Sequence, residues 1–186
     1  SVSLDGSGNL GITDADAAGK NNQLSISNDG AGNIVITDEA EQFRGTGGIA
    51  GATLSNGNRT IAIPVASITG PKIIIDAGSG DDTLTANLAN SLGKTLEFHG
   101  GGHISTNPGD QLILAGGSTT SVTHALTNPG DGSVTLAGAV SGTSNYTGLE
   151  PVTDNLSAID RVFNLSSEPE TITVTDAGGG QTAVAS

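Results

Sequence analysis

Several residue types are missing from this chain or nearly so. It contains no cysteine, methionine or tryptophan, one tyrosine and three phenylalanines among its 186 residues. Without cysteine, neither a disulfide nor a metal site built on thiolates can form. With so few large side chains, a core has to be built from Leu, Ile, Val and Ala. Such a core suits thin, regular layers better than a deep globular interior.

Basic residues are also scarce. Six Lys and Arg against 19 Asp and Glu give a formal net charge of −13 at pH 7. This excess repels nucleic acids and anionic membrane surfaces, and it attracts cations. The chain also lacks an apolar run approaching the roughly 20 residues of a membrane-spanning helix. We therefore expect no nucleic-acid partner and no insertion into a membrane.

The abundant residues are those that form strands and turns. Residues 73–85, IIIDAGSGDDTLT, combine a β-branched run, a glycine-rich corner and a second alternating run. Ile and Thr favour a pleated backbone, and glycine allows positive φ in a tight corner, so this stretch predicts strand, corner and strand. Similar runs recur along the chain, and their predicted centres are Ile12, Ile26, Ile36, Ile49, Ile61, Ile74, Leu84, Leu96, Leu112, Val122, Val134, Tyr146, Val162 and Val174.

Internal repetition suggests how these strands are arranged. The tripeptide Ile/Val-Thr-Asp ends four of the runs, at Asp14, Asp38, Asp154 and Asp176. The first two aspartates are 24 residues apart and the last two are 22 apart. A period in the twenties, built from two or three short strands, is typical of a β-solenoid.

We therefore predict an all-β fold, a parallel β-solenoid of the right-handed β-helix type with about seven turns. It forms a single module over residues 1–186, with Ile12, Ile36 and Ile61 in one vertical row. An antiparallel β-sandwich, whose strands follow one another every ~8–12 residues, is the alternative.

The corner after Asp76 carries a recognisable motif. Residues 77–85 match the nonapeptide G-G-x-G-x-D-x-U-x, except that Ala77 replaces the first glycine, and Asp82 stands at the aspartate position. With the Ile/Val-Thr-Asp strand ends and the stretch 146–151, YTGLEP, the chain resembles repeat modules of large secreted bacterial surface proteins. These are adhesin-like or filament-forming chains with hemolysin-type (RTX) repeats. The resemblance implies calcium-dependent folding outside the cell and a structural or adhesive role.

Calcium takes about six to eight oxygen ligands from carboxylates and carbonyls. Asp110 and Asp131 each follow an Asn-Pro-Gly turn, 28 and 49 residues after Asp82, so the three carboxylates are predicted to form a column along one corner. The predicted calcium ligands are Asp76, Gly78, Gly80, Asp82, Asp110 and Asp131. The alternative is that these residues only form tight corners, with Asx turns to their own backbone.

No enzyme is expected. His99 and His103 flank three glycines, which exclude the helix that would bring both rings to one zinc ion. The acidic pairs Asp81/Asp82 and Glu168/Glu170 have no aromatic platform for a sugar, and no nucleophile motif is present.

The expected function is structural. Neither end of the chain shows a capping helix, and open ends would expose strand edges that pair with another copy. We therefore expect an extracellular or cell-surface repeat unit that stacks end to end in a fibre or array, stabilised by calcium. The alternative is a calcium-dependent adhesive module that binds a glycan or a partner protein.

Overall fold

The structure of the chain is a computed structural model. It describes residues 1–15, 19–104, 109–149 and 152–166, together with the backbone of residues 173–178 and 181–185. Nearly all regular structure is β, and the one helical element among these residues is a 3-10 turn, η1 (Val65–Ser67). None of the described helices has the length and hydrophobicity required to cross a membrane.

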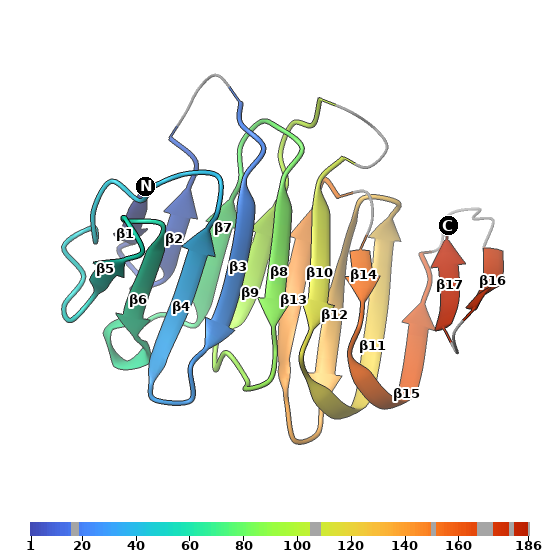
Figure 1. The fold of residues 1–186 in the computed structure, drawn as a ribbon. Coiled ribbons are helices and arrows are strands. Elements are labelled where there is room, and N and C mark those ends of the chain that lie inside the picture. Colours follow the sequence, from blue (N-terminus) through green and yellow to red (C-terminus); the bar gives the residue numbers. More distant parts are fainter. Residues whose placement is uncertain (16–18, 105–108, 150–151, 167–172, 179–180, 186) are drawn as a thin grey trace.

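The strands form two large sheets and one small one (Figure 1). The eight-stranded sheet has the order β1 (Val2–Leu4), β2 (Leu10–Thr13), β7 (Lys72–Asp76), β9 (Thr95–His99), β13 (Gly142–Thr147), β12 (Asp131–Ala137), β11 (Ser118–Asn128) and β15 (Ser157–Asn164). The seven-stranded sheet has the order β14 (Val152–Asp154), β10 (Gln111–Ala115), β8 (Thr83–Asn87), β3 (Gln23–Asn28), β4 (Asn33–Asp38), β6 (Thr60–Pro64) and β5 (Thr53–Ser55). An antiparallel pair, β16 (Thr173–Gly178) and β17 (Gln181–Ala185), belongs to neither.

Both large sheets are mixed. Their centres are parallel, with β2, β7, β9 and β13 adjacent in one sheet and β3, β8, β10 and β14 adjacent in the other. The chain crosses between the sheets after each of β2, β7, β9 and β13. In the seven-stranded sheet the parallel strands reach the edge at β14, and the pairing is antiparallel on their other side, through β3–β4–β6–β5. In the eight-stranded sheet antiparallel pairs flank the parallel strands, β1–β2 on one side and β13–β12–β11 on the other, and the last pair, β11–β15, is parallel again.

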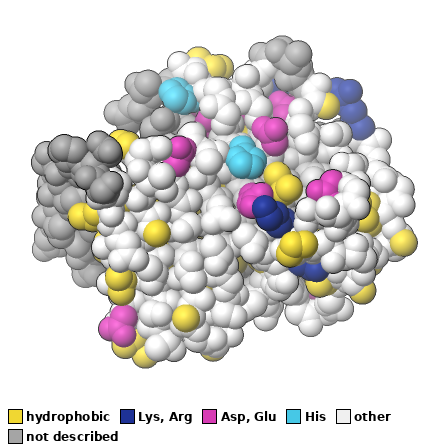
Figure 2. Space-filling model, turned by 180° about the vertical axis from the view of Figure 1, so that it is seen from behind, with side chains coloured by type: hydrophobic (Ala, Val, Ile, Leu, Met, Phe, Trp, Pro, Cys, Tyr) yellow, Lys and Arg dark blue, Asp and Glu magenta, His cyan; other side chains and the backbone are white. Residues whose placement is uncertain are grey.

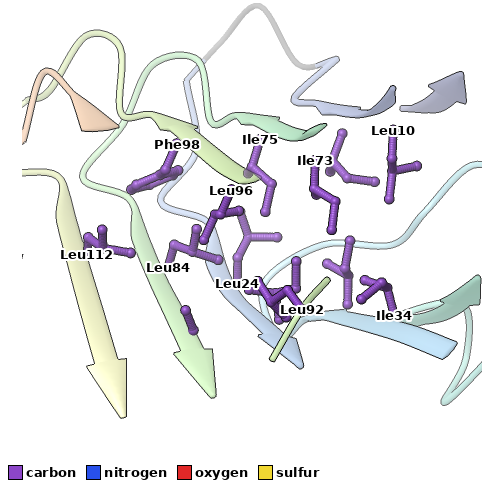
Figure 3. Packing of buried hydrophobic residues seen from close by; sticks show 14 of the residues in the cluster. Leu10, Leu24, Ile34, Ile73, Ile75, Leu84, Leu92, Leu96, Phe98 and Leu112 are labelled. Atoms are coloured by element: carbon purple, nitrogen blue, oxygen red, sulfur yellow. The ribbon is translucent and has the colours of Figure 1, made fainter. Parts of the chain in front are cut away.

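The core lies between the two sheets and consists of aliphatic side chains in rows. Alternate residues of each strand face inward, so Leu10, Ile73 and Leu96 follow one another across three neighbouring strands. Leu24, Leu84 and Leu112 form the opposing row on the other sheet. Figure 3 shows these side chains pointing from the two layers toward each other, with Phe98 among them. Period-two alternation therefore fixes the inward face of each strand.

The predicted parallel solenoid of about seven turns is wrong. Ile36 on β4 lies directly opposite Ile61 on the antiparallel strand β6, and Ile12 belongs to the other sheet. The reason is local: after Asn28 the chain turns through Asp29, Gly30 and Gly32 and returns as an antiparallel neighbour instead of crossing over. Two stacked mixed sheets make the fold sandwich-like, although the alternative prediction of a purely antiparallel sandwich misses the parallel centres.

The two ends of the stacked sheets differ. At the N-terminal end both edge strands, β1 and β5, are three residues long, and the segment 39–52, with Phe43 and Ile49 buried, packs against β1. A Cβ on Gly47 would lie 2.1 Å from the carbonyl oxygen of Val2, so this segment touches the backbone of β1. At the other end the two large sheets stop at β14 and β15, and the separate pair β16–β17 lies beyond β15 (Figure 1). Short, covered edges resist pairing with other chains, so the N-terminal end is closed.

Candidate metal centre

A column of polar residues forms at one corner where the chain passes between the sheets. Asn22, Asp82 and Asp110 each stand directly before a strand, namely β3, β8 and β10. These strands are parallel neighbours and start in register, with Gln23, Thr83 and Gln111 side by side. Residues one position earlier therefore stack on one another, and all three are buried.

Hydrogen bonds run along this column from each layer to the next. The backbone N–H of Asn22 donates to Oδ1 of Asp82 at 2.7 Å, and the N–H of Asp82 donates to Oδ1 of Asp110 at 2.8 Å. The side-chain amide of Asn22 donates to the carbonyl of Ala77 at 3.2 Å. Each Oδ1 therefore satisfies an amide that the corner would otherwise leave without a partner.

Asp82 is the group in this column with an unsatisfied atom. Its side chain is 0% exposed, and within the described residues its Oδ2 has no hydrogen-bond partner. Burial raises the pKa of Asp82, and although the amide of Asn22 opposes this, the charges of Asp110 and Asp14 add to it and the pKa reaches about 7. A buried acceptor without a partner is destabilising unless a proton or a cation satisfies it.

Asp14 joins the column from the opposite sheet. It follows β2, and its N–H donates to the carbonyl of Asp76 at 2.9 Å, which sets it beside Ala77. Its Oδ2 is buried, as is Oδ2 of Asp110. A small cavity of about 40 Å³ lies at this end of the column, lined among others by Asp14, Asn22 and Asp76.

Two glycines make room for the carboxylates. A Cβ on Gly100 would lie 2.7 Å from Oδ2 of Asp110, and one on Gly78 would lie 3.3 Å from Cβ of Asp14. Gly78 also has φ of 90°, a left-handed conformation that glycine adopts without strain. The small residues of this corner therefore allow acidic side chains to enter the interior.

The structure unites only part of the predicted calcium site. Asp82 and Asp110 are adjacent in the column, whereas Asp76 is exposed at the end of β7. Gly78 accepts a hydrogen bond from Gly102, and the N–H of Gly80 donates to Gly102, both at 2.8 Å. These bonds tie the predicted corner to the following layer.

Asp131 lies elsewhere, as the first residue of β12, directly after the turn that follows β11. It accepts hydrogen bonds from the side chain of Asn128 at 2.7 Å and from the N–H of Gly148 at 2.9 Å. These bonds lower the pKa of Asp131, the Asn128 bond most strongly. Asp131 therefore links its own turn to Gly148 and is not part of the column.

The side chains available as ligands at this corner are carboxylates, and carboxylate oxygens bind hard cations such as calcium in preference to softer metal ions. However, no three acidic or histidine side chains among the described residues converge as ligands of one ion. Calcium binding at this corner therefore stays a prediction. The adjacent carboxylates at which an ion would bind are those of Asp82 and Asp110.

The histidines do not form a metal site in the described part of the chain. Nδ1 of His99 lies 2.8 Å from Oγ1 of Thr147 on the outer face of the eight-stranded sheet. Figure 2 shows the side of the molecule that is hidden in Figure 1, where charged and histidine side chains gather in one region of a mostly uncharged surface. An ion pair between Lys72 and Glu97, at 2.7 Å, joins two neighbouring strands, β7 and β9. The pair Glu168/Glu170 and the residues Glu150 and Pro151 lie outside the described residues.

Sequence reasoning missed a second polar cluster, at the C-terminal end of the sheets. Asp154 on β14 accepts a hydrogen bond from Nε of Arg161 on β15 at 2.9 Å, and its Oδ2 lies 3.1 Å from Nε2 of His124 on β11. The ring of His124 stacks on Phe163 with centroids 4.9 Å apart. No short motif links residues that are 30 and 7 positions from Asp154, so only the fold reveals this cluster.

Sequence reasoning also did not identify Asn22 and Asp14 as members of the column, although Asn22 belongs to a short sequence pattern. Asn22-Gln23-Leu24, Asp82-Thr83-Leu84 and Asp110-Gln111-Leu112 share one pattern, a polar residue two positions before an inward leucine. This pattern could have identified Asn22 as a member of the column. Asp14 stands in a repeat that was recognised, but nothing in the repeat shows that it turns inward.

Comparison of the chain with protein-family models, with curated proteins and with solved structures found no significant match in any of the three.

Proposed function

We propose that this protein is a structural unit of an extracellular assembly and that it associates with another molecule through the end formed by β14 and β15. One observation carries this proposal. Among the described residues, five large apolar side chains are exposed, and four of them lie on β15 or directly after it: Ile159, Val162, Phe163 and Leu165. Exposed apolar side chains along an edge strand mark a surface for association.

The edge itself supports the same role. β15 is eight residues long and pairs with β11 on one side, and no described strand pairs with its other side. A long edge strand presents a row of free N–H and C=O groups to another strand. The closed N-terminal end offers no comparable surface, so the proposed association uses one end of the molecule and not both.

Association through β15 is testable on the intact chain. We expect sedimentation velocity to show a larger species as concentration rises. We also expect the outward amides of β15 to exchange their hydrogens more slowly in concentrated than in dilute samples, because pairing protects them. Amides of β8, in the centre of its sheet, serve as the internal control. A single monomeric species at every concentration, with unchanged exchange at β15, would contradict the proposal.

A calcium-stabilised binding module is the second candidate, and the unsatisfied Oδ2 of Asp82 favours it. A ligand that binds only the folded state at about 100 times its dissociation constant adds about 2.7 kcal/mol. Because a domain of this size gains about 2–4 °C in Tm per kcal/mol, we expect calcium to raise Tm by about 5–10 °C relative to chelator. Magnesium, which requires a tighter octahedral shell, should have little effect.

The variant Asp82→Asn separates the two explanations for this corner. If calcium binds there, the variant loses the calcium-dependent increase in Tm, whereas Asp131→Asn keeps it. Equal Tm of the unaltered chain in calcium and in chelator would instead support the interpretation of the corner as plain turn residues. A glycan or protein partner would be sought only after a calcium effect is established.

A further inference from the structure

We propose that the partner at this end is a second copy of the same chain, paired through β15 in an antiparallel, two-fold arrangement centred on Val162. This inference rests on the proposed joining role of β15 and adds the partner, the symmetry and the register. It predicts a closed dimer in which the two eight-stranded sheets become continuous.

The closed N-terminal end selects this symmetry. A head-to-tail fibre needs two different complementary surfaces on each copy, whereas a two-fold dimer uses the same surface twice. Only the β14–β15 end combines a long unpaired edge with exposed apolar side chains among the described residues. At the other end the edge strands β1 and β5 are only three residues long, and the segment 39–52 packs against β1.

The hydrogen-bonding groups of β15 are arranged for this pairing. The N–H of Ser157 donates to the carbonyl of Gly117 at 2.9 Å, in the parallel ladder with β11. Since successive residues of a strand direct these groups to opposite sides, the N–H and C=O groups of Asp160, Val162 and Asn164 face the free edge. An antiparallel partner centred on Val162 places these residues opposite one another.

Side-chain chemistry then selects the register. With Val162 opposite Val162 of the second copy, Asp160 faces Asn164, Arg161 faces Phe163, and Ile159 faces Leu165. Each pair is complementary: apolar with apolar, carboxylate with amide, and cation with aromatic ring. Shifting the centre toward the N-terminus by one residue brings Arg161 opposite Arg161, and by two brings Asp160 opposite Asp160, and like charges directly opposite each other are destabilising. Shifting it by one residue toward the C-terminus instead brings Val162 opposite Asn164 and Arg161 opposite Leu165, which places polar against apolar side chains.

Contacts within one chain already hold Arg161 in position to meet Phe163 of the second copy. It is bonded to Asp154 and to the carbonyl of Leu156, and it shares a face of β15 with Phe163, the face on which Val122 and His124 of β11 are buried. The apolar side chains of that face lie beyond the last strand of the seven-stranded sheet, which ends at β14. Pairing two copies would cover part of this face.

Disulfide cross-linking tests the register, because the chain contains no cysteine and an introduced thiol can pair only with its copy in the second molecule. A single Val162→Cys substitution, at a side chain 44% exposed, places two thiols opposite each other in the proposed dimer. Opposed residues of a hydrogen-bonded antiparallel pair have Cα atoms about 5.5 Å apart, within the ~4.4–6.8 Å that a disulfide spans. We expect rapid formation of a covalent dimer under mild oxidation.

Ile159→Cys is the matched control. Ile159 is more exposed, at 81%, so its thiol is more accessible to chance collisions. In the proposed register it lies about 20 Å from the same residue of the second copy, because six residues at ~3.3 Å separate them along the strand. We expect at least a tenfold slower cross-link at this position. Equal rates at the two positions would overturn the register.

A lysine introduced on the free edge of β15 tests the dimer independently, by its effect on the sedimentation of the chain. We expect Val162→Lys to be monomeric under conditions in which the unaltered chain sediments as a dimer, because lysine on an edge strand opposes pairing. Thr135→Lys, on the exposed face of the central strand β12, should remain dimeric. Higher salt should strengthen the dimer, since each copy carries a net charge of −13.

The possible failures are distinguishable. Assemblies that grow beyond a dimer, without selective cross-linking at position 162, would overturn the two-fold pairing and leave the joining role of β15 in place. A monomer at all concentrations would overturn both. A monomer in which the β15 amides are nevertheless protected would show that the edge is covered within one chain, and would also overturn both.

Discussion

The variant Asp82→Asn is expected to be more stable than the unaltered chain at pH 7–8 in the presence of chelator, by about 2–4 kcal/mol. The pKa of Asp82 is about 7 in the fold, against 3.8 for an unperturbed aspartate. Each pKa unit corresponds to about 1.4 kcal/mol, so ionised Asp82 destabilises the fold by up to about 4 kcal/mol above pH 7. Asparagine removes that charge and keeps an oxygen for the N–H of Asn22, whose own side chain shows that an amide fits this column.

The sign of the pH dependence follows from the same shift. Between about pH 4 and pH 7 the folded chain binds the proton of Asp82 and the unfolded chain does not, so the free energy of unfolding falls as pH rises. Urea unfolding at several pH values would measure this. We expect a negative slope over that range for the unaltered chain and a flatter profile for Asp82→Asn.

Asp76→Asn is the matched control, because it removes the same charge from an exposed side chain. It should change the free energy of unfolding by less than about 0.5 kcal/mol. A loss of stability in Asp82→Asn at pH 8 without calcium would show that the ionised carboxylate stabilises the fold, and would contradict the prediction that its burial is destabilising.

The second large effect is expected at Asp154, with the opposite sign. Burial raises the pKa of Asp154, but hydrogen bonds from His124, Arg161 and the amide of Leu156 outweigh it and lower the pKa to about 2. The ionised carboxylate therefore contributes about 2 kcal/mol above pH 4, and this contribution is lost as pH falls from about 4 to about 2. Asp154→Ala also leaves His124 and Arg161 without their acceptor.

We expect Asp154→Ala to lose about 2–4 kcal/mol at pH 7, within the range for breaking a buried polar network. At pH 2 the difference from the unaltered chain should shrink by about 2 kcal/mol. Asp76→Ala, which truncates an exposed aspartate outside this cluster, is the control and should have little effect. A loss at Asp154 that is independent of pH would indicate a packing defect instead of an electrostatic one.

The two residues together predict an unusual pH optimum. Asp82 favours the folded state increasingly as pH falls toward 4, and Asp154 ceases to stabilise it below that value. We therefore expect maximal stability near pH 4, more acidic than the usual range of about pH 5–8.

Local patterns in the sequence predict the strands well. Of the predicted strand centres, only Ile49 lies outside a strand, and Leu84 and Leu96 are buried, whereas Ile74 lies between the buried Ile73 and Ile75. The sequence also places Asp82 and Asp110 at corners before strands that prove to be adjacent. Both results depend on the period of side chains along one strand and on turn residues, which neighbouring residues determine.

Local patterns did not predict the order of the strands within the sheets. Asp29-Gly30 and Asn56-Gly57 are hairpin signals, yet spacing alone favours a crossover at each repeat, and this produced the wrong solenoid prediction. Asp14, Asn22 and the His124–Asp154–Arg161 cluster likewise come together only through pairings between distant strands.

What the sequence by itself determined is which residues extend, which turn, and which side of each strand is apolar. Only the tertiary structure decided whether a strand returns beside its predecessor or crosses to the other sheet. The physical reason is that both routes bury the same alternating side chains equally well. Turn geometry and the packing of the two inner faces choose between them, and that choice also left β15 as a long open edge and brought Asp82 into the interior.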